Sequence, residues 1–348
     1  MVNYKWHATK ANVKGIGTLE QSTRRLLMRE QSRIPSEPTG SASVSAFPAR
    51  VVILSKFVFL ISNGRSGSSL VHEILARHPE VGFISNLEDR LPSLPPSAGR
   101  YNNLLYRRMP PSLTQKGRLR FAPSEAYRIL TRQVSAMIAD SVRDLEASDA
   151  MPWVARRFES FFGERAAVQD KSVFLHKFTG WPRTGFIRAI MPDARFIHIV
   201  RDGRAVVTST LRSFWGWPGY RGVHHLHTPL PPSYEAEWEA SGRSFPLLSG
   251  LVWKTRMDLF AGARAAVPAG QWADYRFEDI LAEPDRYLKL MLEFMELEQD
   301  KRFDDSLAKI KLVPGQRDAF RRDLDGRSLA LLDDSLGDHL DAWGYSRR

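Results

Sequence analysis

Two short segments of the chain combine the residue types that bind anions, and the first spans residues 64–69 with the sequence GRSGSS. Its glycines let backbone N–H groups approach a ligand closely, and its serines add hydroxyl donors. Arg65 contributes a full positive charge. A helix beginning here would add the partial positive charge of its N-terminus. The segment is a candidate phosphate- or sulfate-binding loop, although such a turn also serves as an ordinary connection between a strand and a helix.

The second segment, residues 201–209, reads RDGRAVVTS. Arg201 and Arg204 place two guanidinium groups, each with several N–H donors for a phosphate, beside a glycine. The structural alternative is that both arginines pair with Asp202 or with other carboxylates at the surface. Arg-Asp-Gly-Arg alone favours that alternative, whereas its combination with the first segment favours anion binding.

The elements around both segments predict that they lie together. The apolar, β-branched run Val51 to Ile61 indicates a buried strand before the first segment, and Leu70, Val71, Ile74 and Leu75 indicate one face of a helix after it. Phe196 to Val200 indicates a second buried strand, followed by a helix. Ligands of parallel sheets bind at the carboxyl ends of the strands, so both segments should open onto one edge. Two anion sites on one edge suit a ligand with two phosphate-like ends.

The remaining pattern alternates strands with helices, which predicts an α/β fold with a P-loop-like parallel sheet flanked by helices. We expect residues 1–48 to be a polar N-terminal extension and residues 49–348 to form a single domain. Residues 90–117 are rich in proline, serine and arginine and are expected to be irregular. Further strands are expected at 173–175 and 272–277, and helices at 124–145, 182–190, 205–211, 245–266, 284–295 and 329–343.

Composition limits the possible functions. The chain has 348 residues and no cysteine, which excludes disulfides, thiolate catalysis and cysteine metal sites. Its 50 Lys and Arg against 39 Asp and Glu, a net charge of +11, suggest an anionic partner. The arginines are spread along the chain, so we do not expect a nucleic acid. No apolar stretch is long enough to span a membrane, and no secretory signal is visible, which predicts a soluble cytoplasmic protein.

Taken in order along the chain, these segments resemble the sulfotransferase superfamily from Phe57 to Tyr345. The first segment is similar to the family's 5′-phosphosulfate loop, and the second to its 3′-phosphate loop. Tyr275 to Ile280 and Gly344-Tyr345 resemble two further family segments. The resemblance implies transfer of a sulfuryl group from 3′-phosphoadenosine 5′-phosphosulfate (PAPS) to a hydroxyl, with 3′-phosphoadenosine 5′-phosphate (PAP) as product. The cofactor-binding residues it implies are Arg65, Ser66, Gly67, Ser68, Ser69, Arg201 and Ser209.

The same resemblance implies catalytic groups. A family lysine lies about 25 positions before the second loop, which favours Lys177, 24 positions before Arg201, over Lys171, 30 positions before it. Lys177 and Arg65 would stabilise the charge that develops on the leaving group. Glu88 is the candidate general base, although family spacing points to Asn86. Asp89 and His72 are the alternatives. The sulfuryl group carries about one negative charge, so side chains can suffice and we expect no metal ion.

Two questions stay open. A P-loop kinase or another nucleotide phosphotransferase is the rival function, but Ser68 stands where the Walker A motif has lysine. The acceptor could be a hydroxyl-bearing small molecule, a carbohydrate or a lipid, and residues 90–117 and 214–232 are expected to shape its pocket.

The histidines of residues 224–227 lack partner ligands at metal-binding spacing and are not interpreted as a metal site. The sequence does not indicate the oligomeric state.

Overall fold

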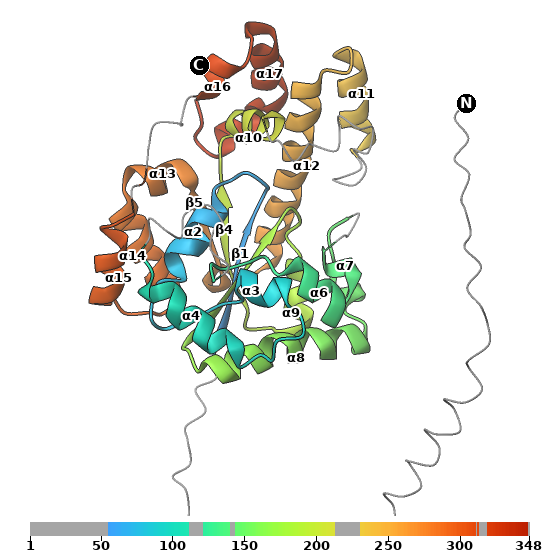
Figure 1. Ribbon diagram of the computed structural model, residues 1–348. Helices are drawn as coiled ribbons and strands as arrows, with labels where there is room; N and C mark the ends of the chain where they lie inside the picture. The colour runs from blue at the N-terminus through green and yellow to red at the C-terminus, as the bar shows by residue number, and fades with distance from the viewer. Residues whose placement is uncertain are drawn as a thin grey trace, which may run out of the picture. The chain divides into compact units, whose positions relative to one another are not determined.

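The computed structural model describes residues 55–110, 121–139, 143–212, 230–310, 312 and 319–346. A five-stranded sheet with the order β2-β3-β1-β4-β5 forms the centre of these residues (Figure 1). All four strand pairings are parallel. This topology confirms the predicted α/β fold. The strands are β1 (Lys56–Ser62), β2 (Val81–Gly82), β3 (Val173–Thr179), β4 (Arg195–Val200) and β5 (Trp272–Arg276).

Both faces of the sheet are buried under helices. Along β1, Val58 and Leu60 face one cluster of apolar side chains while Phe59 and Ile61 face the other, and all four are almost fully buried. Such two-sided burial is typical of parallel strands and explains their nearly continuous apolar sequences. The face that carries Phe59 and Ile61 packs on α6 (Tyr127–Gln133), α8 (Pro152–Gln169), α9 (Thr184–Ile190), α10 (Gly203–Leu211), α12 (Phe245–Ala266) and α17 (Gly326–Ala342). The face that carries Val58 and Leu60 packs on α2 (Ser68–Leu75), α13 (Phe277–Ala282), α14 (Pro284–Phe294) and α15 (Lys301–Leu307) (Figure 1).

The prediction of one long helix over residues 124–145 is wrong. Its place is taken by α6 and the short α7 (Ala136–Ala139). Between them the Ser135 hydroxyl accepts a hydrogen bond from the Met137 N–H, as a capping serine does at the start of a new helix. The apolar residues keep helical spacing across this break, so the periodicity alone did not reveal it.

The expectation of an irregular segment over residues 90–117 is also wrong in part. Residues Ala98–Arg108 form the helix α4, which follows the short α3 (Asn86–Arg90). The inner face of α4 includes Asn102 and Asn103, whose amides bond to Ser85, Phe83 and Gln169, and this polar face weakens the apolar period. The remaining described helices are η2 (Ala147–Asp149), α11 (Pro232–Ala240), η5 (Ala269–Gln271) and α16 (Ala319–Asp323). Within the described ranges, no helix is long and apolar enough to cross a membrane.

Arg204, at the start of α10, ties the end of the chain to the sheet. It is 1% exposed, and its guanidinium donates to both carboxylate oxygens of Asp202. It also donates to Asp333 on α17 at 2.7 Å and to the Ser346 carbonyl at 2.7 Å. Because a buried charge needs partners at all of its donors, this arginine fixes the position of α17 against α10.

We predict that Arg204→Ala lowers the free energy of unfolding by about 3 kcal/mol, because Asp202 would stay buried without its partner. A matched control is Arg302→Ala. Arg302 makes the same fork to Asp300, two residues earlier, but at the exposed start of α15. Removing this exposed pair should produce no measurable change. Urea denaturation of both variants checks the prediction, and equal effects would contradict the role assigned to Arg204.

Candidate anion-binding site

The two anion-binding segments meet at the carboxyl edge of the sheet. They follow β1 and β4, which are neighbours. Arg65 Nε donates to Ser209 Oγ at 3.0 Å, and Arg201 Nη1 donates to the Arg65 carbonyl oxygen at 3.0 Å. The guanidinium of Arg201 also lies 5.5 Å from the ring centre of Phe277, within reach of a cation–π contact. The structure therefore brings Arg65, Arg201 and Ser209 together, as predicted.

The backbone of the first loop is shaped to present N–H groups. Arg65 and Gly67 both have left-handed conformations, with φ of 66° and 83°. Gly67 is the N-cap of α2, and no side chain caps the first turn of that helix. The Ser66 hydroxyl is buried and has no hydrogen-bond partner in the described part of the chain, whereas Ser68 shares a hydrogen bond with Ser62. A non-glycine residue at positive φ, uncapped N–H groups and an unpartnered hydroxyl are features of a loop built around an anion.

The structural alternative for the second segment holds for Arg204 but not for Arg201. Arg204 pairs with Asp202, whose carboxylate also caps α10. The Asp202 N–H in turn donates to Glu278, which accepts a second hydrogen bond from the Tyr345 hydroxyl at 2.8 Å. Burial raises the pKa of Glu278. The two further segments singled out in the sequence, around Glu278 and Tyr345, thus hold the second loop in place.

Lys177 joins the site from the other side of β1. It lies on β3, is 4% exposed, and its Nζ donates to Ser69 Oγ at 2.6 Å. The same ammonium group forms an ion pair with Glu125 at 2.6 Å. Lys171 lies before the first residue of β3, at the opposite end of that strand, and pairs with Glu80 at 3.5 Å. The structure therefore brings Lys177, and not Lys171, to the first loop.

A cavity of about 610 Å³ lies beside Lys177 and Ser69. One wall is the face of α2 that carries Ser69, His72 and Glu73, which are neighbours at i, i+3 and i+4. The other walls come from α3 and from the start of α6. The lining side chains from these walls that can ionise or donate hydrogen bonds are Asn86, Asp89, Ser124, Glu125, Tyr127 and Arg128. A polar cavity next to the predicted catalytic lysine is the candidate pocket for an acceptor.

Glu88, the candidate base, does not line this cavity. It is 2% exposed and forms a capping box with Ser85 at the start of α3, and its Oε1 lies 3.7 Å from Arg165 Nε. Burial raises its pKa. Asn86, to which the family spacing points, does line the cavity. The structure thus places Glu88 in an internal polar cluster rather than beside Lys177.

Asp89 and His72, the two alternatives to Glu88, both line the cavity, but their surroundings differ. Asp89 Oδ1 accepts hydrogen bonds from the N–H groups of Arg128 and Ile129, so this carboxylate anchors the first turn of α6. His72 is buried, and burial together with Lys177 lowers its pKa well below the usual range. Its Nε2 has no hydrogen-bond partner among the described residues. Burial therefore disfavours the charged form of His72, and the side chain of Asp89 is engaged by the first turn of α6.

Sequence reasoning missed Glu73. Its carboxyl group lines the cavity, and burial raises its pKa from 4.5 to about 7 although Lys177 and Arg77 act in the opposite direction. Its helical spacing from Ser69 was the available signal, because residues four apart lie on one helix face. A carboxyl group that titrates near neutral pH in a cleft is a typical functional candidate.

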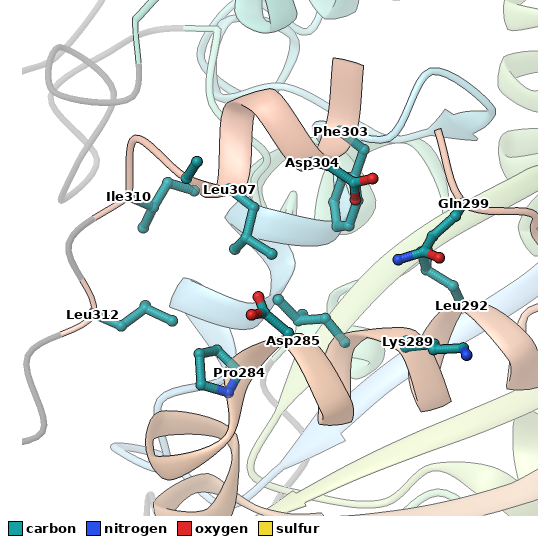
Figure 2. Close-up of a pocket in the computed structure, with 12 residues that line it drawn as sticks. Pro284, Asp285, Lys289, Leu292, Gln299, Phe303, Asp304, Leu307, Ile310 and Leu312 are labelled. Carbon is teal, nitrogen blue, oxygen red and sulfur yellow. The ribbon is translucent and has the colours of Figure 1, made fainter. Parts of the chain in front are cut away.

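A second cavity, of about 890 Å³, lies between α14 and α15 (Figure 2). Leu292, Phe303 and Leu307 give it a largely apolar wall, and none of the predicted site residues lines it. Among the described residues there is no group of three or more side chains suited to hold a metal ion. The histidines of residues 224–227 and nearly all of the predicted acceptor segment 214–232 lie outside the described residues.

Comparison with known proteins assigns a family. A family model described as "Sulfotransferase family" matches residues 58–301, more than half of the chain. Two curated relatives, from Mycobacterium bovis and Mycobacterium tuberculosis, both carry the name omega-hydroxy-beta-dihydromenaquinone-9 sulfotransferase Stf3. Each is 25% identical over 186 residues, which cover 51% of this chain and 42% of the relative. The matched region thus spans less than half the length of these relatives.

Solved structures with a similar arrangement carry related titles. Sulfotransferase STF9 from Mycobacterium avium is 12% identical, with a TM-score of 0.49 over 84% of this chain and 78% of its own. The sulfotransferase domain from the curacin biosynthetic pathway is also 12% identical, with a TM-score of 0.45 over 84% of this chain and 99% of its own.

We predict that Gly67→Ala lowers the free energy of unfolding by about 3 kcal/mol. A Cβ at this left-handed position would lie 2.2 Å from the Phe277 ring, so backbone strain and overcrowding add. The control in the same loop is Gly64→Ala, whose Cβ would make only an ordinary contact, 3.7 Å from Thr179. It should change stability by no more than about 0.5 kcal/mol. Thermal unfolding of the two variants distinguishes them, and an unaffected Gly67→Ala variant would contradict the loop geometry.

Proposed function

We propose that this chain, which belongs to the sulfotransferase family, transfers a sulfuryl group from PAPS to an acceptor hydroxyl and releases PAP. The observation that carries the proposal is the junction of the two loops, in which Arg65 contacts Ser209 and Arg201 contacts the Arg65 carbonyl. PAPS carries a phosphosulfate at one end and a 3′-phosphate at the other. Two cationic loops at one sheet edge suit such a substrate.

Each loop has groups suited to one end of PAPS. We assign the 5′-phosphosulfate to Arg65 and to residues 66–69, because the uncapped start of α2 and the unpartnered Ser66 hydroxyl supply donors there. We assign the 3′-phosphate to Arg201 and Ser209. Arg201 is suited to this role because its carboxylate neighbours are engaged elsewhere, Asp202 with Arg204 and Glu278 with Tyr345.

The proposed reaction is an in-line displacement at sulfur. The acceptor oxygen forms a bond to sulfur while the bond from sulfur to the bridging phosphate oxygen breaks, and that oxygen leaves with the electron pair. Lys177 and Arg65 are the proposed groups that stabilise its growing charge, because preorganised cations in a sheltered site act most strongly where charge develops. Lys177 is already held between Ser69 and Glu125, which orients its ammonium group. Side chains therefore supply the positive charge without a metal ion.

The acceptor is proposed only as a hydroxyl compound. The names of the two mycobacterial relatives specify an omega-hydroxy-beta-dihydromenaquinone-9, which supports a hydroxylated lipid as one class. The polar walls of the cavity beside Lys177 equally suit a carbohydrate or another polar small molecule.

The donor assignment predicts tight binding of PAP in EDTA. Arg201→Ala should weaken binding about 10- to 100-fold, as expected for loss of a hydrogen bond to a charged group, and Ser209→Ala by a smaller factor. Isothermal titration calorimetry measures both, with the exposed Arg302→Ala variant as the control that should bind like wild type. Failure of the wild-type protein to bind PAP, or binding of ATP only with Mg²⁺, would contradict the proposal and favour a kinase.

The catalytic assignment of Lys177 predicts a separate effect on turnover. Lys177→Met should slow the conversion of PAPS to PAP and sulfate, with water as the acceptor, about 100- to 1,000-fold. PAP affinity should change much less. Lys171→Met is the matched control and should retain wild-type turnover, because Lys171 lies at the other end of β3. Chromatographic measurement of PAP formation decides between the two lysines, and the reverse pattern would contradict the assignment.

A further inference from the structure

The cavity beside Lys177 contains one carboxyl group that no other described side chain engages. Glu73 lies on α2, one helical turn after Ser69, and its carboxylate has no hydrogen bond or ion pair with any described residue. The backbone carbonyl of Glu73 accepts a hydrogen bond from the Tyr106 hydroxyl at 2.8 Å, which holds this turn of α2 against α4. The Glu73 side chain is therefore available to a ligand in the cavity, and its backbone is held in place by α4.

The neighbouring carboxylates are engaged. Glu125 is ion-paired with Lys177, Asp89 accepts two backbone N–H groups of α6, and Glu88 belongs to the capping box of α3. A carboxylate whose oxygens are held by these partners is not directed at an acceptor hydroxyl, whereas a general base must reach the proton that it removes. Removing a proton from an acceptor hydroxyl requires a base in the same cavity as the group that stabilises the leaving oxygen. Glu73 lies in the cavity beside Lys177, and its carboxyl group is not engaged by any other described side chain.

We propose that Glu73 is the general base of the transfer reaction, accepting the proton of the acceptor hydroxyl as its oxygen bonds to sulfur. The electron pair of the broken bond stays on the bridging phosphate oxygen, near Lys177, and the proton on Glu73 is later lost to water. The inference rests on the proposed sulfotransferase function and deepens it. It places the base on α2, one residue after His72, rather than at Glu88 or Asp89 on α3.

The environment of Glu73 sets the expected pH dependence. Burial is the main influence and raises its pKa to about 7, while Lys177 and Arg77 lower it. A raised carboxyl pKa means that the basic form is lost as pH falls below about 7, so turnover should rise about tenfold per unit up to that pH and then level off. The titratable and charged groups around it are His72 on α2, Arg77 just after α2, Asp89 on α3, Glu125, Tyr127 and Arg128 at the start of α6, and Lys177 on β3.

The test compares Glu73→Gln and Glu73→Asp with the matched control Glu293→Gln, on the exposed face of α14. The probe is PAPS alone, with water as the acceptor, and formation of PAP and sulfate is followed from pH 5.5 to 9. We expect Glu73→Gln to lose about 100-fold or more in turnover together with the rise towards pH 7, and Glu73→Asp to recover part of both. PAP affinity, measured by calorimetry, should stay within about threefold of wild type.

Three results would overturn the inference. If wild-type protein turns over PAPS and Glu73→Gln retains both its rate and its pH profile, Glu73 is not the base, although the sulfotransferase function stands. If Glu73→Gln loses PAP affinity in parallel with turnover, the residue supports the donor site instead. If wild-type protein neither binds PAP nor turns over PAPS, the proposed function fails, and this inference fails with it.

Discussion

The parallel pairing of β1 with β3 on one side and β4 on the other is the constraint on which the site depends. Ser62, the last residue of β1, aligns with Thr179 of β3 and with Ile199 of β4, so three strands end at one edge. The first loop, Lys177 and Arg201 come from these three strands. They lie far apart in the chain, and the sheet register brings Lys177 to Ser69 and Arg201 to the Arg65 carbonyl oxygen. Apolar residues on both faces of β1 keep it central, because only an interior strand buries both faces.

The buried polar groups divide into those that hold the loops and those that are left for a ligand. In the second loop, the Arg204 guanidinium is paired with Asp202 and Asp333. Glu278 on α13 accepts hydrogen bonds from the Asp202 N–H and from the Tyr345 hydroxyl. Arg201, which precedes α10, places its guanidinium at the sheet edge beside the Arg65 carbonyl. Asp89 in the cavity wall and Glu88 in the interior hold helix ends, whereas the Glu73 carboxyl group has no partner among the described side chains. The partners of each side chain therefore decide whether it holds the structure together or remains available to a ligand. Arg204 and Arg201 differ in this way, and so do Glu88 and Glu73.

The sequence was sufficient for the parts of the fold that have a strong period or a fixed spacing. Four of the five strands and the two loops were predicted because short strand–loop–helix units carry their own signals, and the family resemblance pointed to Lys177. The two-residue strand β2 was not predicted. The break at Ser135, the helix α4 with its buried asparagines and the placement of Glu88 were not predicted. At Ser135 the apolar spacing continues across the break, whereas α4 and Glu88 depend in part on residues distant in the chain. Gln169 bonds to Asn103, and Arg165 lies beside Glu88, and no local pattern encodes these tertiary contacts. The capping box between Ser85 and Glu88 is a local signal that indicates the start of α3.

The central claim is that one nucleotide bridges the two loops, and the most direct test is a crystal structure of the protein grown with PAP in EDTA. We expect the 5′-phosphate to lie at the N-terminus of α2, in contact with residues 66–69, and the 3′-phosphate to contact Arg201 and Ser209. Electron density for PAP in any other place, or with its 3′-phosphate at the first loop, would contradict the claim.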